Sequence, residues 1–130
     1  MTIIDIRRPA LLAAALLGLS GAVMAQGFLG ASRAAPGTVM IELTPTTYQN
    51  GRLEVQMSVT THSANDLDTY DLTKVVTLEV QGKRIAPVAA PKLEGHHNRG
   101  QLAFEAPALK SPFSIVISDL HDPGRKVFSW

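Results

Sequence analysis

The 130-residue chain contains no cysteine. A disulfide framework is therefore excluded, and no cysteine is present to carry a lipid after an export signal. The folded part of the chain must be held together by the burial of apolar side chains alone. The sequence also lacks an internal repeat, so it predicts one small domain rather than an array.

The short motifs that mark common enzyme classes are missing as well. The sequence has no Gly-x-Ser-x-Gly elbow, no His-Glu-x-x-His pair and no glycine-rich phosphate loop. His62 and Asp66 have the residue types of a base and its orienting partner, but no activated nucleophile accompanies them. We therefore predict that the protein is not an enzyme.

The chain has no excess of charge of either sign. It carries twelve basic and eleven acidic side chains, and its first 25 residues contain Asp5, Arg7 and Arg8. Ten side chains of each sign remain without that segment, which gives a net charge of zero. Nucleic acid and anionic membrane surfaces are therefore not expected as partners, because both require a basic excess.

The N-terminal segment has the pattern of an export signal. Arg7 and Arg8 precede an apolar stretch at 10–19, and small residues lead to Val23, Met24 and Ala25. This pattern predicts a signal peptide over 1–25 that is cleaved before Gln26. The apolar stretch is too short for a retained membrane anchor, so we expect a periplasmic or extracellular protein with no membrane span in its mature form.

The remaining sequence predicts a leader followed by strands. Residues 26–37 are rich in glycine and alanine and favour a flexible leader, so the domain is expected over 38–130. Apolar and polar residues alternate with period two in several short segments, most clearly at 53–60. Asn50-Gly51 and Gln81-Gly82 are typical hairpin turns, whereas the polar stretch 63–73 and the segment 89–99 are expected to be loops. The predicted strands are 39–44, 53–60, 75–80, 83–88, 102–104, 113–117 and 127–130.

About seven short strands separated by turns predict an all-β fold, an antiparallel immunoglobulin-like β-sandwich. Each connection in such a fold reverses the chain, so the loops after the second, fourth and sixth strands share one end. His62 lies in the first of these loops, His96 and His97 in the second, and His121 in the third. We therefore expect all four histidines at one pole of the domain.

Several separated motifs resemble a family of small exported prokaryotic β-domains without an established activity. The resemblance rests on Thr-His-Ser at 61–63 followed by Asp66-Leu67, on Tyr-Asp-Leu at 70–72, and on Gly-His-His at 95–97. It extends to the C-terminal Phe128-x-Trp130. It implies a fold and no catalytic residues. This chain departs from the pattern at Ala64-Asn65 and ahead of the Gly-His-His loop.

The clustered histidines predict a metal site. Imidazole nitrogens with a carboxylate are suitable ligands for copper(II) or zinc, and His62, His96, His97 and Asp66 supply them. Asp68 and Glu94 are further candidates. Because adjacent residues of an extended chain point to opposite faces, only one of the two neighbouring histidines is expected to bind the ion.

A structural interpretation competes with the metal site. The histidines could instead brace neighbouring loops, with Asp66 and Asp71 forming Asx-type turns and the Tyr70 hydroxyl bonded to backbone. His121 is followed by Asp-Pro-Gly and is expected to be a solvated turn residue rather than a ligand.

These observations together predict an exported, non-enzymatic binding domain. It would bind through the loops after its second and fourth strands, with a copper or zinc ion as the most specific candidate ligand and a small molecule or peptide as another. The alternative is a structural or interaction module that docks another protein of the cell envelope, in which the histidines only brace the loops.

Overall fold

A computed structural model describes residues 29–33 and 37–130, so the predicted signal peptide at 1–25 and parts of the predicted leader lie outside the described residues. The described chain is mostly antiparallel β-structure in two sheets, which confirms the all-β sandwich. Its elements are β1 (Ser32–Arg33), β2 (Val39–Gln49), β3 (Arg52–Thr61), a 3-10 turn (Leu67–Thr69), α1 (Leu72–Val75), β4 (Val76–Val80), β5 (Lys83–Ile85), β6 (His97–Glu105), β7 (Phe113–Ser118) and β8 (Arg125–Ser129).

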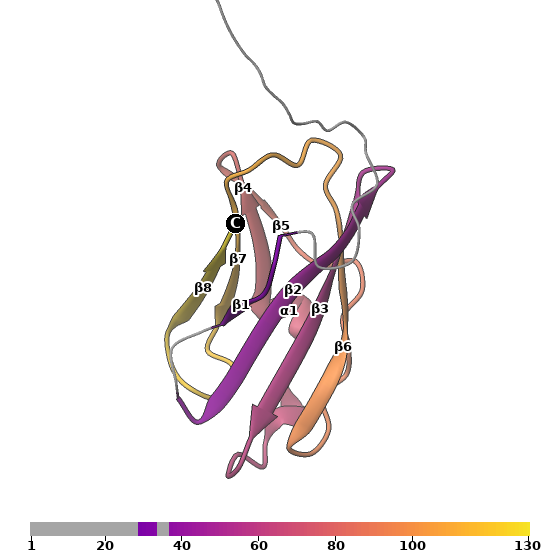
Figure 1. Ribbon diagram of the computed structural model, residues 1–130. Helices are drawn as coiled ribbons and strands as arrows, with labels where there is room; N and C mark the ends of the chain where they lie inside the picture. Colours follow the sequence, from indigo (N-terminus) through magenta and orange to yellow (C-terminus); the bar gives the residue numbers. More distant parts are fainter. Residues whose placement is uncertain (1–28, 34–36) are drawn as a thin grey trace, which may run out of the picture.

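The two sheets face each other across one core (Figure 1). The strand order is β1-β2-β3-β6 in the first sheet and β5-β4-β7-β8 in the second. Alternate residues of both sheets point inward, as two packed antiparallel sheets require. The largest fully buried side chains are Phe104, Phe128, Leu43, Leu53, Met57, Leu67, Leu72, Leu78, Leu93, Leu102, Ile115 and Ile117.

The β2–β3 hairpin confirms the strongest pattern in the sequence. Buried and partly exposed residues alternate along β3 without a break, and the turn residues Asn50 and Gly51 have φ angles of 53° and 76°. Strand β2 is longer than predicted, because it continues beyond Pro45 to Gln49. The pairing register shifts between Pro45 and Thr47, and this bulge lets the strand pass the proline.

The β4–β5 hairpin turns at Gln81 and Gly82, as predicted, with φ angles of 50° and 78°. Strand β5 ends at Ile85, which makes the predicted strand 83–88 too long. Pro87 is buried just beyond that end. Because proline has no N–H to donate to a ladder, its position is consistent with the early end of the strand.

Strand β6 starts much earlier than predicted, so His97 lies in a strand and not in a loop. Its first five residues are polar or glycine and show no apolar alternation, because this half of the strand lies at an edge of the first sheet. A bridge covers the other half of that edge: the N–H of Val88 donates to the carbonyl of Ala103 at 2.8 Å, and the N–H of Ala103 to Ala89 at 2.9 Å. The segment 88–96 is thereby aligned along β6.

The stretch 63–75 contains one 3-10 turn and the four-residue helix α1, where no helix was predicted. Single turns are too short to show a helical period in the sequence. The Asx-type turn predicted at Asp71 is confirmed, because hydrogen bonds from the hydroxyl and the N–H of Thr73 reach its carboxylate and lower the pKa of Asp71. None of the helices within the described ranges is long and apolar enough to cross a membrane.

Residues of the predicted leader contact the sandwich. Ser32 and Arg33 pair with β2 as the short strand β1. The indole N–H of Trp130 donates to the carbonyl of Gly30 at 3.1 Å, and its ring stacks on Phe113 with 5.5 Å between the ring centroids. The N-terminal segment therefore lies beside both the first sheet and the C-terminal residue.

Candidate functional site

Three segments that carry the histidines meet at one end of the sandwich, at the lower end of Figure 1. We call this end, formed by residues 61–71, 92–97 and 119–124, the histidine pole. The N–H of Thr61 donates to the carbonyl of His96 at 2.9 Å, and the ring of His121 bonds to Asp66. The prediction that chain reversal places these loops together is confirmed by these contacts.

The first segment of the pole is fixed by a buried hydroxyl. The Thr61 Oγ1 donates to the carbonyl of Thr38 at 2.8 Å and accepts from the N–H groups of Ser63 and Ala64. Thr61 is 1% exposed, so these bonds are shielded from water. Leu67 follows as a fully buried anchor, which leaves the polar residues between the two anchors on the surface.

The second segment returns along β6 and ends in a tight turn. Leu93 is fully buried. The side-chain oxygen of Asn98 accepts from the N–H of Glu94 at 2.7 Å, and Gly95 has a φ angle of 63°, which favours glycine. The side chains of Glu94 and His96 are therefore presented on either side of this turn.

The shortest histidine contact joins the first and third segments. Nδ1 of His121 lies 2.7 Å from Oδ1 of Asp66, and the Tyr70 hydroxyl donates to the other carboxylate oxygen at 3.4 Å. An ionised carboxylate only accepts hydrogen bonds, so Nδ1 of His121 carries the proton in this pair and Nε2 is directed away from it. His121 is thus not merely a solvated turn residue, contrary to the sequence-based expectation.

The other structural predictions for this region have mixed outcomes. Asp66 does not form an Asx-type turn, because its carboxylate reaches across to His121. Tyr70 bonds to that carboxylate and not to backbone. It is Tyr48 whose hydroxyl ties strands together through backbone, by donating to the carbonyl of Ala106 at 2.7 Å.

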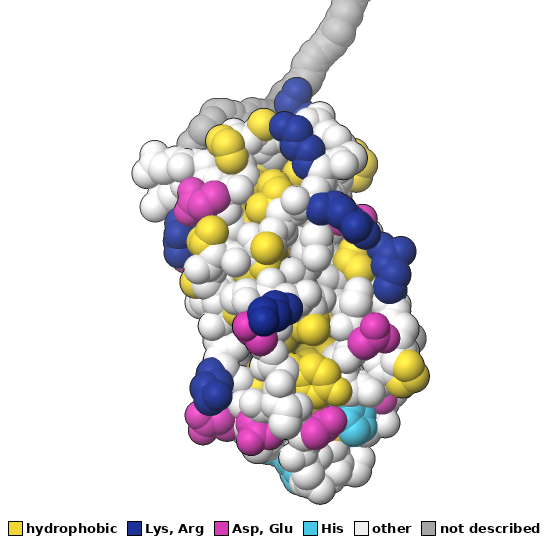
Figure 2. Space-filling view, turned by 180° about the vertical axis from the view of Figure 1, so that it is seen from behind, with side chains coloured by type: hydrophobic (Ala, Val, Ile, Leu, Met, Phe, Trp, Pro, Cys, Tyr) yellow, Lys and Arg dark blue, Asp and Glu magenta, His cyan; other side chains and the backbone are white. Residues whose placement is uncertain are grey.

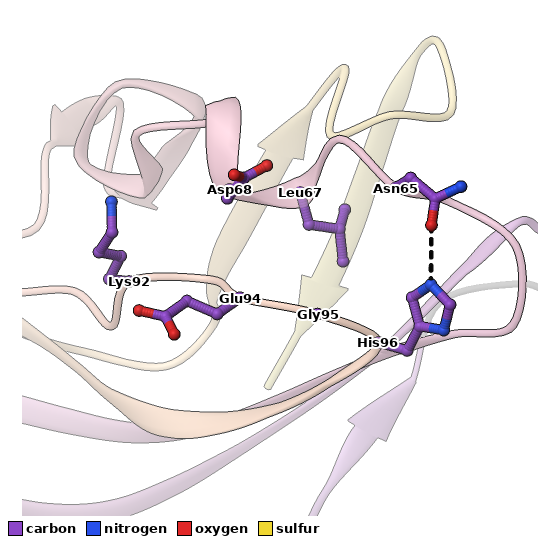
Figure 3. A pocket seen from close by; sticks show the side chains of 7 residues that line it. All are labelled: Asn65, Leu67, Asp68, Lys92, Glu94, Gly95 and His96. Atoms are coloured by element: carbon purple, nitrogen blue, oxygen red, sulfur yellow. Dashed lines mark hydrogen bonds between the residues drawn. The ribbon is translucent and has the colours of Figure 1, made fainter.

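A hollow of about 390 Å³ lies between the first two segments of the pole (Figure 3). The bond between Nε2 of His96 and the side-chain oxygen of Asn65, 3.1 Å long, closes one end of it. Charged side chains gather toward the other end, and Leu67 lies between the two. The main lining residues are Asn65, Leu67 and Asp68 from one segment and Lys92, Glu94 and His96 from the other.

The predicted metal ligands do not form a single cluster. Asp66 is paired with His121 and His96 with Asn65, whereas His62 and His97 are exposed. Within residues 29–33 and 37–130, no three side chains of the His, Cys, Asp and Glu types are grouped so that they could hold a metal ion. Each of these two pairs contains only one of the four predicted ligands, so the four-residue site stays a prediction.

Sequence reasoning missed Asn65 and the pairing role of His121. No spacing rule connects Asp66 with a residue 55 positions later. The sequence signal that could have pointed to His121 is the polar composition of the loop after β7. In the structure, Asp119 and His121 of this loop have positive φ angles of 56° and 63°. Such a conformation is uncommon for residues other than glycine, and here it directs the imidazole toward Asp66.

We expect the Asp66–His121 pair to stabilise the fold by about 1 kcal/mol, because both side chains are only partly exposed, at 44% and 31%. A double-mutant cycle with Asp66→Ala and His121→Ala, measured by urea unfolding, isolates this coupling. The matched control is His62→Ala, an exposed histidine of the same pole, which should change stability by less than about 0.5 kcal/mol. A coupling energy of zero contradicts the bracing role of His121.

The third segment of the pole holds the start of β2 through Asp122. Burial alone would raise the pKa of Asp122. However, the N–H of Val39 at 2.9 Å, the hydroxyl of Thr38, and the positive charges of Lys126 and His121 together lower that pKa below its ordinary value of 3.8. The stabilisation from Asp122 is therefore fully present above about pH 4 and is lost as the pH falls through the lowered pKa.

We expect Asp122→Asn to cost about 1 kcal/mol at pH 7, because an amide oxygen can still accept from Val39 but carries no charge. The stability difference between the wild type and this variant should shrink below pH 4, when Asp122 of the wild type becomes protonated. Urea unfolding at pH 7, 4 and 3 measures it, with the exposed Asp68→Asn as the control. An equal difference at pH 7 and pH 3 contradicts the assignment.

No protein-family model, curated protein or solved structure matches this chain. The resemblance to the exported β-domain family therefore stays a prediction, and the function is inferred from the geometry of the pole.

Proposed function

We propose that this protein is an exported, non-enzymatic binding domain that receives a positively charged group of its partner in the hollow of the histidine pole. The observation that supports this most directly is the hollow itself, which lies between the two loops expected to bind from the sequence. Asp68 and Glu94 on its walls outnumber Lys92, so its charge is negative when His96 is neutral. A cationic group is the ligand that such walls favour.

The walls fit a side chain more closely than a bare ion. Leu67 offers an apolar surface between the charged end and the end that the Asn65–His96 bond closes. A lysine or arginine side chain of an envelope protein has the matching chemistry, because its methylene stem packs on apolar surface while its charged end meets carboxylates. This proposal combines the binding role with the interaction-module alternative.

The binding proposal is tested by titrating the ¹⁵N-labelled protein with Nα-acetyl-lysine methylamide and recording amide chemical shifts. We expect changes confined to residues 65–68 and 92–96, and an affinity about fivefold lower in the Asp68→Asn/Glu94→Gln variant. The matched control is Glu105→Gln, which removes an equivalent carboxylate at the other end of β6. Equal shifts in the wild type and the double variant rule out this site.

A transition metal is the second candidate ligand. The favouring observation is the Asp66–His121 pair, because a carboxylate on Nδ1 of an imidazole is the usual orienting contact of a metal-binding histidine. Calorimetric titration with copper(II) and zinc(II) tests it, using His121→Ala and the His62→Ala/His96→Ala/His97→Ala variant beside the wild type. A metal site at the histidine pole is excluded if none of the three proteins gives a binding heat. It is also excluded if all three give the same binding heat.

We also propose that the sandwich is immunoglobulin-like and that the chain is exported. In support of the first, β2, β3 and β6 correspond to strands A, B and E of that fold, and β4, β7 and β8 to strands C, F and G. Strand β5 differs from this scheme. It pairs with β4 in the second sheet, whereas strand D of a constant-type domain belongs to the sheet of strands A, B and E.

Export is supported by the pattern of residues 1–25, and the intact mass of secreted material should correspond to a chain that begins at Gln26.

A further inference from the structure

A second hollow, of about 400 Å³, lies on the outer face of the β5-β4-β7-β8 sheet beside the β4–β5 turn. This site is separate from the histidine pole, because the turn joins the opposite ends of the strands. Glu79 and Ser114, which are paired in neighbouring strands, line it. The other residues that matter for its chemistry are Lys83, Arg84, Phe113 and Arg125.

The hollow carries an excess of positive charge. Arg84 and Arg125 both lie near one carboxylate, that of Glu79, and Lys83 also lines the hollow. Figure 2 shows this face of the molecule, with most of the Lys and Arg side chains in its middle and upper parts, the His side chains at the lower end, and Asp and Glu side chains along the lower end and at a few places above it.

Glu79 lies within ion-pair distance of both guanidinium groups. One of its oxygens lies 3.5 Å from Nε of Arg84 and 3.6 Å from a terminal nitrogen of Arg125. A guanidinium has five N–H donors, so each arginine keeps donors that this carboxylate does not use. The shared carboxylate brings the two side chains, which come from different strands, toward one point of the hollow.

The backbone around these cations is well defined. The positive φ angles of Gln81 and Gly82 make a tight turn that places Lys83 and Arg84 directly at the rim. On the other side the wall includes Phe113, which is buried and stacked on Trp130. Cationic donors on a fixed wall are the arrangement that recognises an oxyanion, because planar guanidinium groups match its oxygen geometry.

We propose that this hollow binds a phosphate group, carried either by a small soluble molecule or by a lipid headgroup. The two guanidinium groups against one carboxylate leave a net positive charge that attracts an anion, and a phosphate offers several oxygens that can bridge the two groups. The Glu79 carboxylate competes with the ligand for the two guanidinium groups and repels it. The proposal does not depend on the function assigned to the histidine pole.

The test uses ¹⁵N-labelled protein, expressed from the full 130-residue sequence and titrated with inorganic phosphate at constant ionic strength, with chloride as the reference anion. We expect amide shifts centred on 79–84 and 113–114, and binding about fivefold weaker in the Arg84→Gln/Arg125→Gln variant. Arg52→Gln is the matched control, because Arg52 lies on the first sheet and is held by Glu54 and Glu105. Glu79→Gln should have the opposite effect on affinity. It removes the carboxylate that repels the ligand, so phosphate should bind more tightly, by about twofold or more.

Two vesicle arms identify the source of the phosphate. Co-sedimentation with phosphatidylglycerol vesicles that the double variant abolishes, and that phosphatidylcholine vesicles do not reproduce, assigns a lipid headgroup. Localised phosphate shifts without such sedimentation assign a soluble ligand. The proposal is overturned if phosphate shifts are absent, spread over all basic residues, or equal in the wild type and the Arg84→Gln/Arg125→Gln variant.

Discussion

Leu93→Ala is expected to lower the free energy of unfolding by about 2–5 kcal/mol, the range for removing a fully buried leucine side chain and leaving a cavity. Leu93 is 1% exposed, and among residues 90–96 it is the fully buried one. The segment around it has no strand ladder of its own. Besides a few hydrogen bonds to β6 and to Thr61, its position therefore depends on this side chain packing into the core.

Urea unfolding measures the effect, as a lower midpoint with an unchanged dependence on urea concentration. The control is Val88→Ala in the same segment, where the side chain is 55% exposed and the change should stay within about 0.5 kcal/mol. A loss below about 1 kcal/mol for Leu93→Ala would show that the segment is held by its hydrogen bonds to β6 and Thr61 rather than by Leu93.

Leu93 also connects stability with the proposed binding function. Lys92 and Glu94 flank it in sequence and both line the hollow of the histidine pole. Loss of the anchor should therefore weaken binding of the lysine probe even under conditions in which the variant is still folded. A variant with lower stability and unchanged probe affinity would separate the hollow from the core packing beneath it.

Sequence reasoning predicted the parts of the fold in which the type of each residue follows from its own burial or its own backbone conformation. The ten residues of β3 alternate strictly because both neighbours of that strand are in the same sheet and one face is buried throughout. The turns at Asn50-Gly51 and Gln81-Gly82 require positive φ angles, which their residue types disclose. Parity then placed the histidine loops at one end.

The parts that could not be predicted depend on contacts between distant segments. The first half of β6 has no apolar pattern because an edge strand needs none, so His97 was assigned to a loop. The burial of Ala103 depends on the segment that runs along β6, and the choice of His121 as the partner of Asp66 depends on two loop conformations. Residue types predicted a histidine cluster but not which imidazole meets which acceptor.

The close packing of that segment along β6 leads to the second large prediction, for Gly100→Ala. A Cβ atom at Gly100 would lie 2.4 Å from Cβ of Pro91, closer than any ordinary contact. The proline ring cannot rotate away, because it is closed on its own backbone. The Ala89–Ala103 bridge holds the segment on one side and the buried Leu93 on the other, so one of the two backbones must shift.

We expect Gly100→Ala to destabilise the protein by about 3 kcal/mol through this overpacking. The direction of this change in the free energy of unfolding is informative, because alanine in place of glycine within a strand normally stabilises a protein by roughly 0.5–1 kcal/mol. Thermal and urea unfolding measure the effect, and Gln101→Ala, the next and exposed residue of β6, is the control. Because Pro91 directly precedes the wall of the hollow, the same variant should also move the amide signals of 92–96. A neutral or stabilising result would mean that the segment does not pack against β6 at this distance, and the wall of the proposed binding site would then lose its support.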